Sequence, residues 1–348
     1  MDQLKMLKHG TTRWLSIGRC LTRLLKNWEP LKLFSKKECK RKDSSAHAKK
    51  KSEKILTVLR SRSTRLYLMF LQYTIQPFES FLTVHQSDAP KTSTIMADSK
   101  KLIKALMSCF VAPSAFGGNK SVLEVQYKLP YNVLANKDIL VGEECQKFIS
   151  NKDKNKLSDS KLKEFYSNVK KFFTVTVDYL LKSLPLSDPV LTKLSITDPA
   201  SLPESSSNSI RFLAQRYPVL IAANSSLDTV LEQFVNLQCS MPVDLEVTRV
   251  DEFWVSCSQM TEGTSKLYDA ISFFMLGLLT IPHSSAHCER VFSCVRKIKT
   301  DQRSSMAPKT LESLLVLKHR QNSTFNVNEL SPATLRQLKG AYTASLSK

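Results

Sequence analysis

The stretch HSSAHCERVFS, residues 283–293, holds the side chain best suited to chemistry, Glu289. A carboxylate in front of a basic helix could bind a divalent cation in metal-dependent phosphoryl transfer. That reaction needs several carboxylates converging on two cations about 4 Å apart, so one glutamate does not suffice. The alternative is a solvent-facing acid near a helix amino terminus, where the helix dipole stabilises negative charge.

Three neighbours of Glu289 raise the possibility of a zinc site. His283 and His287 are four residues apart, which would place them on one helix face, and Cys288 follows directly. Pro282, however, places His283 before the helix, and Cys288 belongs to an apolar stripe. The pattern therefore predicts no bound metal and no other cofactor.

Positive charge is concentrated near the amino terminus. The formal net charge is +20, and residues 1–65 hold 19 Lys or Arg against 5 Asp or Glu. Such an excess indicates a polyanionic partner, nucleic acid in the first place. Arg13 and Trp14 could contact DNA by charge and stacking. A tryptophan at a helix start is also a common core anchor, and that alternative is favoured.

The run KKECKRKDSSAHAKKKSEK, residues 36–54, is the stronger nucleic-acid feature. Its cations could neutralise phosphates without reading sequence. The residues expected to contact DNA in this run are Lys40, Arg41, Lys42, Lys49, Lys50 and Lys51. Two basic clusters around a polar spacer also resemble a bipartite nuclear-localisation signal, as against a plain exposed loop or helix face. We therefore expect a nuclear protein, with the cytosol as the fallback.

The elements that must position these residues are helices. The chain has 348 residues, 42% of them apolar, and only 8 glycines, too few for a fold built on glycine-rich phosphate loops. Apolar residues recur at helical spacing around residues 17–28, 66–84, 97–111, 162–181 and 227–237. Pro77 predicts a kink in the second of these. The run TVTV at residues 174–177 could be a strand, but length and period favour helix.

Two further features divide the chain. Residues 183–209 are rich in Pro and Ser, which predicts a linker or a long surface loop. After Pro282, Cys288, Val291, Phe292, Val295 and Ile298 form one apolar stripe, and a helix opening near Pro308 carries a second. With the apolar helix at 266–280, these helices could bury against each other or against a second copy. The expected dimerisation residues are Phe274, Leu278, Val291, Phe292, Val295, Leu311, Leu314 and Leu315.

Cysteine spacing and hydropathy exclude other classes. The 8 cysteines include no CxxC pair, so reduced thiols are expected in place of a zinc module or a disulfide framework. The longest apolar run, FFMLGLLTI at 273–281, is far shorter than the roughly 20 residues of a membrane span. We expect neither a membrane nor a small-molecule substrate as a partner.

Two segments together resemble the hAT superfamily of transposases. IPHSSAHCERVFSCVRKIKTDQRSSMAPKTLESLLVLKHR, residues 281–320, resembles the family's carboxy-terminal dimerisation region, which contains an ERxFS motif followed by a basic stretch and a leucine helix. TTRWLSIGRCLTRLLKNWEPLKLF, residues 11–34, is similar to the family's TRW-containing segment. ERxFS with its flanks is fairly specific, whereas TRW alone is weak. The resemblance spans nearly all of the chain and is strongest over its last 100 residues.

The resemblance implies roles for particular residues. In the family, an RNase H-like core holds two aspartates and one glutamate that bind the metal ions for strand transfer. Glu289 matches that glutamate, and Trp14 matches the tryptophan that handles flanking DNA. The family's aspartates precede the TRW motif, where this sequence offers only Asp2 as an acid, outside any strand-like segment. The resemblance therefore implies that the chain is catalytically inactive and that Glu289 is vestigial.

The sequence thus predicts a mainly α protein, a helical insertion plus the carboxy-terminal helices of an incomplete RNase H-like core. The expected parts are a basic segment with the TRW motif (1–65), the insertion (66–182), the linker (183–209), the dimerisation region (210–325) and a tail (326–348). The predicted function is dimerisation, with itself or with related hAT-like proteins, and non-specific DNA binding in the nucleus. One alternative is a fragment of an active transposase whose catalytic part lies outside this sequence; another is a monomeric helical scaffold.

Overall fold

Helices make up most of the structure, a computed structural model in which the mainly α class is confirmed. The structure describes residues 15–118, 120–151, 155, 157–240, 249–320, 331–334 and 336–337. Within these residues the only sheet is a two-stranded hairpin, β1 with β2, so the RNase H-like core stays a prediction. The chain divides into two compact units, Met1–His283 and Ser284–Lys348.

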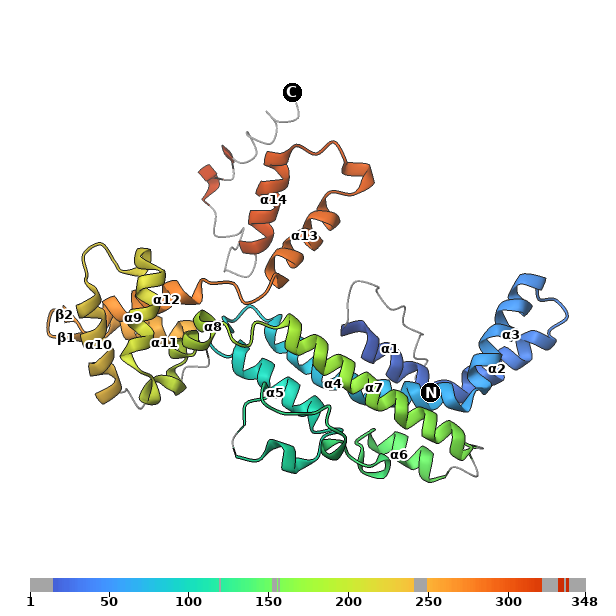
Figure 1. Cartoon of the computed structure of the whole chain (residues 1–348). Coiled ribbons are helices and arrows are strands. Elements are labelled where there is room, and N and C mark those ends of the chain that lie inside the picture. The colour runs from blue at the N-terminus through green and yellow to red at the C-terminus, as the bar shows by residue number, and fades with distance from the viewer. Residues whose placement is uncertain are drawn as a thin grey trace. The chain divides into compact units, whose positions relative to one another are not determined.

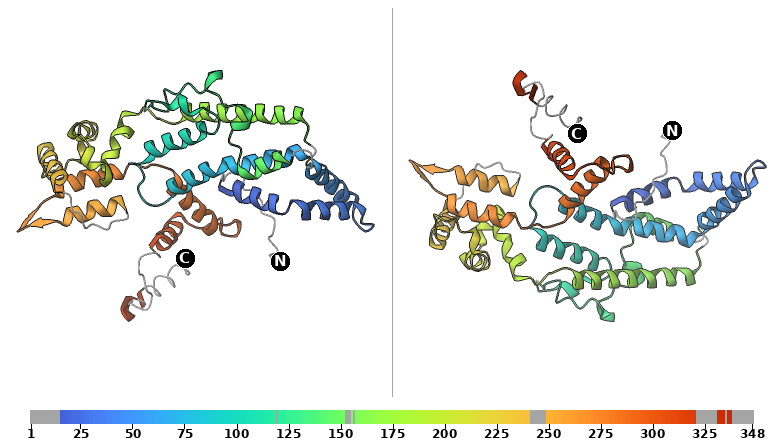
Figure 2. Two further views of the ribbon diagram at one scale, coloured as in Figure 1. Left: turned by 90° about the horizontal axis from the view of Figure 1, so that it is seen from below. Right: turned by 90° about the horizontal axis from the view of Figure 1, so that it is seen from above.

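The first four helices follow one another closely. They are α1 (Leu15–Lys26), α2 (Trp28–Lys40), α3 (Ala46–Arg60) and α4 (Arg62–His85). The second and third lie side by side as an antiparallel pair, which we call the basic arm, residues 28–60 (Figures 1 and 2). Ser35 and Ser52 are buried in this pair, where small side chains let the two helices approach closely. Ser45 caps α3 by accepting a hydrogen bond from the backbone N–H of Ala48 at 3.2 Å.

The helix α1 packs against α4 through a glycine. The backbone N–H of Gly18 donates to Oε1 of Glu79 at 3.1 Å, so a carboxylate lies at the amino-terminal turn of α1. A Cβ atom on Gly18 would lie 2.2 Å from the same oxygen. A larger residue at position 18 would therefore displace the Glu79 carboxylate and break this hydrogen bond.

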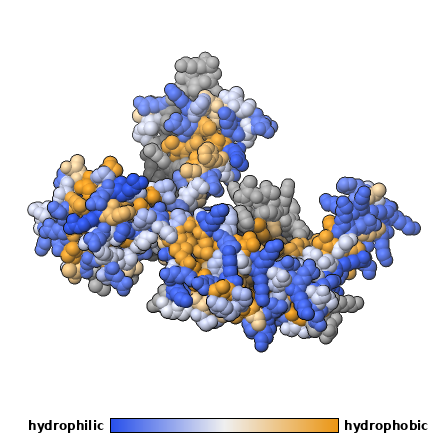
Figure 3. All heavy atoms as spheres, viewed as in Figure 1, coloured by the Kyte–Doolittle hydropathy of each residue, from blue (hydrophilic) through white to orange (hydrophobic). Residues whose placement is uncertain are grey.

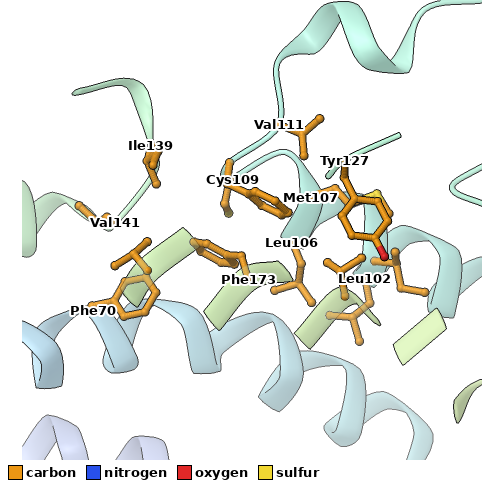
Figure 4. Packing of buried hydrophobic residues seen from close by; sticks show 14 of the residues in the cluster. Phe70, Leu102, Leu106, Met107, Cys109, Val111, Tyr127, Ile139, Val141 and Phe173 are labelled. Atoms are coloured by element: carbon orange, nitrogen blue, oxygen red, sulfur yellow. The ribbon is translucent and has the colours of Figure 1, made fainter. Parts of the chain in front are cut away.

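The first core of this unit lies among long helices. Its elements are α4, α5 (Ile95–Met107), η1 (Pro113–Phe116), η2 (Pro130–Asn132), η3 (Asn136–Asp138), α6 (Glu143–Ser150) and α7 (Asp159–Ser183). Phe70 of α4 meets Phe165, Phe172 and Phe173 of α7, and Phe110 stacks on Phe173 at 5.6 Å. Figure 4 shows Phe70 and Phe173 among the packed side chains of this core. The helix α7 confirms the helical interpretation of TVTV, and Pro77 lies inside α4.

A second core begins within the segment that was expected to be a linker. Its elements are α8 (Pro189–Lys193), η4 (Leu194–Thr197), η5 (Pro199–Glu204), α9 (Ser207–Arg216), η6 (Pro218–Leu220), α10 (Leu227–Cys239), α11 (Val250–Gln259), β1 (Thr261–Glu262), β2 (Ser265–Lys266) and α12 (Asp269–Leu279).

Residues 183–209 are therefore folded, contrary to the sequence-based expectation. Leu194, Ile196 and Leu202 are almost fully buried. The indole Nε1–H of Trp254 donates to the carbonyl of Thr197 at 2.8 Å. Pro189 and Pro199 start short helices, and Ser201 and Ser205 bond to nearby backbone carbonyls. The composition therefore reflects tight turns in a core and not a free linker.

The second unit is a pair of helices. They are α13 (Ala286–Ile298) and α14 (Pro308–Arg320), with the short η7 (Asp301–Arg303) between them. Pro308 is the first residue of α14, as expected for a residue that lacks a backbone N–H. No helix in the described part of the chain is both long and apolar enough to cross a membrane.

Candidate functional site

The second unit leaves most of its apolar side chains accessible. Val291, Val295, Leu311, Leu314 and Leu315 are only partly buried in the pairing of α13 with α14. Phe292 and Leu317 remain 64% and 54% exposed. Among the described residues of this unit, Ala286 alone is buried. A contiguous apolar surface of this kind marks an interaction site more often than an isolated exposed leucine does.

A groove runs between the two helices. It has a volume of about 480 Å³ and is lined by His287, Val291, Pro308, Leu311, Glu312, Leu315 and Val316. Hydrophobic residues gather on this pair of helices in the space-filling view (Figure 3). Of the expected dimerisation residues, Val291, Leu311 and Leu315 line this groove. We use the name hairpin face for the groove lining together with the accessible side chains of the same two helices, Phe292, Val295, Leu314 and Leu317.

Two of the expected dimerisation residues lie elsewhere. Phe274 and Leu278 of α12 are 0% exposed in the second core. They pack against helices of their own chain, so contact with another copy would require this core to open. Their apolar run predicts burial, but the sequence does not distinguish burial in a core from burial in an interface.

Glu289 lies in the first turn of α13 and is exposed. Its Oε1 accepts a hydrogen bond from the hydroxyl of Ser285 at 3.0 Å, and its backbone N–H donates to the Ser285 carbonyl. Ser285 occupies the N-cap position of α13. This geometry is that of a helix-terminal acid, and no group of three His, Cys, Asp or Glu side chains suited to a metal occurs among the described residues.

The neighbours of Glu289 do not converge with it. His283 precedes α13, and its Nε2 lies 3.1 Å from the carbonyl oxygen of His85. Cys288 is exposed, whereas the stripe predicted that it would be buried. The reason is that α13 has one helical partner in this unit, which covers only part of its apolar stripe.

His283 belongs to a cluster at the end of α4. His85 is buried, and its Nε2 lies 3.3 Å from Oδ2 of Asp98. Burial lowers the pKa of His85, an effect that the Asp98 carboxylate partly opposes. Thr92 donates from its hydroxyl to the carbonyl of Ile281 at 2.9 Å. This cluster fixes the segment that follows α12.

The basic arm carries the cations expected to bind DNA. Lys40, Arg41, Lys42, Lys50 and Lys51 are exposed and Lys49 is partly buried; all lie around the turn between α2 and α3. The residues of 36–54 include nine Lys or Arg and three Asp or Glu. Arg41 lies 3.9 Å from Glu38, so that acid offsets one cation only in part. Arg13 and Trp14 lie outside the described residues.

Sequence reasoning missed one surface, the flank of α3 at the root of the arm. Ile55 and Val58 are exposed there, one helical turn apart. Their spacing with Leu59 is visible in the sequence. The neighbouring lysines made charge the dominant signal in this segment, so the apolar spacing of these residues was not used to predict a surface.

The comparisons with known proteins match only the carboxy-terminal part of the chain. Residues 240–320 match the family model of the hAT family C-terminal dimerisation region. No curated protein and no solved structure matches the chain. The matched residues include α11, α12 and the whole hairpin face. Residues 240–320 are therefore an hAT family C-terminal dimerisation region, and this part of the chain is related to the carboxy-terminal portion of hAT-superfamily transposases.

Proposed function

We propose that this chain pairs with a second copy of itself, or with a related hAT-like chain, through the hairpin face, and acts without catalysing strand transfer. The observation that carries the proposal is the apolar surface of α13 and α14 that no described residue of the unit covers. Two copies related by a two-fold axis would present the same face to each other, so the same exposed side chains would be covered in both copies. Phe292 is the strongest anchor because aromatic residues dominate interface energies.

Catalytic inactivity is supported by the surroundings of Glu289. A two-metal centre requires several carboxylates on converging elements. Glu289 is exposed and bonded to Ser285, and no second acid joins it in the described part of the chain. A nicking assay on supercoiled plasmid with Mg²⁺ or Mn²⁺ tests this. We expect no cleavage by the wild type or by Glu289→Gln; cleavage that Glu289→Gln abolishes would refute the proposed inactivity, because it would require a working metal centre that includes Glu289.

Non-specific DNA binding by the basic arm is the second part of the proposal. Its support is the set of exposed cations on both sides of one turn, which could follow a phosphate backbone. The same cluster supports nuclear localisation, which a fluorescent fusion of residues 36–54 would test.

A charge-matched pair of variants tests DNA binding. The arm variant replaces Lys49, Lys50 and Lys51 by Gln. The control variant replaces three lysines of α7 by Gln: Lys161, Lys163 and Lys171. Each phosphate contact contributes about 0.9 to the slope of log affinity against log salt. We expect the arm variant to lower that slope by up to about 2.7 in duplex titrations, and the control to leave it unchanged. A salt-independent affinity, or equal losses in both variants, would remove DNA from the function.

A further inference from the structure

An apolar groove lies at the root of the basic arm, away from its cationic turn. It has a volume of about 280 Å³ and is lined by Leu24, Trp28, Lys54, Ile55, Val58, Leu59 and Leu68, contributed by α1, α2, α3 and α4. In Figure 3, hydrophilic residues dominate the arm, and hydrophobic ones appear where it joins the rest of the first unit. Lys54 is the one charged residue in the lining.

The groove is open on the side of α3. Ile55 is 41% and Val58 52% exposed, so both reach solvent although they border Trp28, which is buried. The volume is below the roughly 300–1,000 Å³ of pockets that enclose a drug-sized molecule. Its shape and lining suit instead a few aliphatic side chains presented by another helix, the recognition mode in which an amphipathic helix lies in a hydrophobic groove.

The charges around the groove indicate which charge a helix that binds in it should carry. Lys51 precedes Ile55 by one turn and Lys54 precedes Val58 by one turn, so both lie on the flank that carries the apolar residues. No carboxylate of the described residues pairs with either lysine. Glu53 is offset to the other side of α3 by the helical period. The rim is therefore a surface of uncompensated positive charge.

The acids nearest to the groove do not change this. Glu29 of α2 is held by Arg65 at 3.1 Å and by Lys32 at 3.5 Å. Glu38 lies at the far end of the arm with Arg41. An occupant with carboxylates along its flanks would thus find unpaired cations, whereas a basic occupant would be repelled.

A second copy of this chain does not fit these requirements. The chain carries a net charge of +20, and the basic arm is itself cationic. Its acid-rich turns lie at Glu143–Glu144 and Asp251–Glu252, where the same helices bury Cys145 and Phe253 in their own cores. The apolar faces next to these acids are already covered. Glu312 of α14 lies beside accessible apolar residues, but the same helix carries Lys309 and Lys318, so we take the occupant to be a different protein.

We propose that the groove binds an acidic amphipathic helix of a partner protein, with aliphatic anchors one turn apart between Ile55 and Leu68 and carboxylates facing Lys51 and Lys54. The groove shares no residue with the hairpin face, and its rim shares only Lys51 with the residues expected to bind DNA. Binding here brings a different protein to the arm while the far end of the arm keeps its cations. The interaction combines a salt-insensitive apolar contact with a salt-sensitive rim.

The test uses a labelled helical peptide of about 15 residues, long enough to form a marginal helix alone, with Leu at i, i+3, i+4 and i+7 and Glu at the flanking positions. A control peptide carries Lys in place of Glu. Fluorescence anisotropy with the full chain should show saturable binding of the acidic peptide and at least about tenfold weaker binding of the basic one. Equal affinities for both peptides, or no binding of either, would overturn the proposal.

Variants locate the site. Val58→Asp should weaken binding of the acidic peptide by at least about tenfold, because a carboxylate would replace an apolar anchor in the groove. Val175→Asp, at a residue of α7 that is 56% exposed, is the matched control and should not change it. Circular dichroism checks that both variants fold, and duplex binding by Val58→Asp should be retained because its turn is intact. An unchanged peptide affinity in Val58→Asp, or a Val58-dependent binding to phosphatidylserine vesicles without peptide binding, would refute the helix site.

Discussion

Replacing Phe292 by Ala should separate the dimer into monomers without unfolding the chain. A phenylalanine side chain buries roughly 150–250 Å² in a core or an interface. Because Phe292 is 64% exposed, roughly 100–160 Å² of it remains for a partner to cover. At about 25 cal/mol per Å², full coverage would contribute roughly 2.5–4 kcal/mol per copy.

A two-fold interface loses this contribution twice, since the substitution is present in both copies. The upper limit is then roughly 5–8 kcal/mol per dimer. Interfaces rarely cover a residue completely, so we take half, roughly 2.5–4 kcal/mol, which raises the dissociation constant by about two to three orders of magnitude.

The assay is sedimentation velocity or light scattering over a concentration series. The matched control is Phe34→Ala, since Phe34 of the basic arm is 62% exposed and lies outside the matched residues 240–320. We expect the wild type and Phe34→Ala to share one dissociation constant and Phe292→Ala to be monomeric over the same range. A wild type that is monomeric at every concentration, or a Phe292→Ala dimer as tight as the wild type, would refute the hairpin face as the interface.

Further predictions concern stability and coupling. Trp254→Phe removes the hydrogen bond to the buried Thr197 carbonyl and should lower the free energy of unfolding by about 1–3 kcal/mol in urea titrations, with residues 183–209 most affected in hydrogen exchange. Because burial lowers the pKa of His85 below its ordinary 6.5, stability should be full above about pH 6.5 and fall on acidification, and His85→Gln should flatten that dependence. Finally, Phe292→Ala should weaken binding to long duplexes while the Gln variant of Lys49–Lys51 leaves dimerisation unchanged, because two arms on one dimer bind with avidity.

Helical periodicity predicted the elements well because local signals set them. The stretches around 66–84, 162–181 and 227–237 each became one helix, α4, α7 and α10, since their apolar residues recur at the helical period. The prediction of a linker or long surface loop at residues 183–209 was wrong because its outcome depends on contacts that are distant in the sequence. Its Pro and Ser content indicates turns, and only tertiary contacts such as that of Trp254 with Thr197 reveal that these turns are packed in a core.

The sequence predicted an apolar interaction surface on the carboxy-terminal helices, but it did not predict all the residues of that surface correctly. The stripes on α13 and α14 identified the hairpin face, because an apolar stripe needs a partner whatever that partner is. Phe274 and Leu278 were assigned to the same interface, yet they fill the second core. An apolar stripe predicts that one face of a helix is buried. Which element buries that face depends on how the other helices of the chain pack.

Positive charge near an apolar surface affects how tightly two copies of this chain can pair through that surface. An apolar face next to a dense cationic run would lose affinity for another copy, since like charges would meet across the two-fold axis. The hairpin face lies on α13 and α14, which carry basic residues of their own, among them Arg296, Lys297 and Lys318. Salt should therefore weaken DNA binding without weakening dimerisation. Counterion release drives DNA binding, whereas burial of apolar surface drives dimerisation and salt screens the like charges of the two copies.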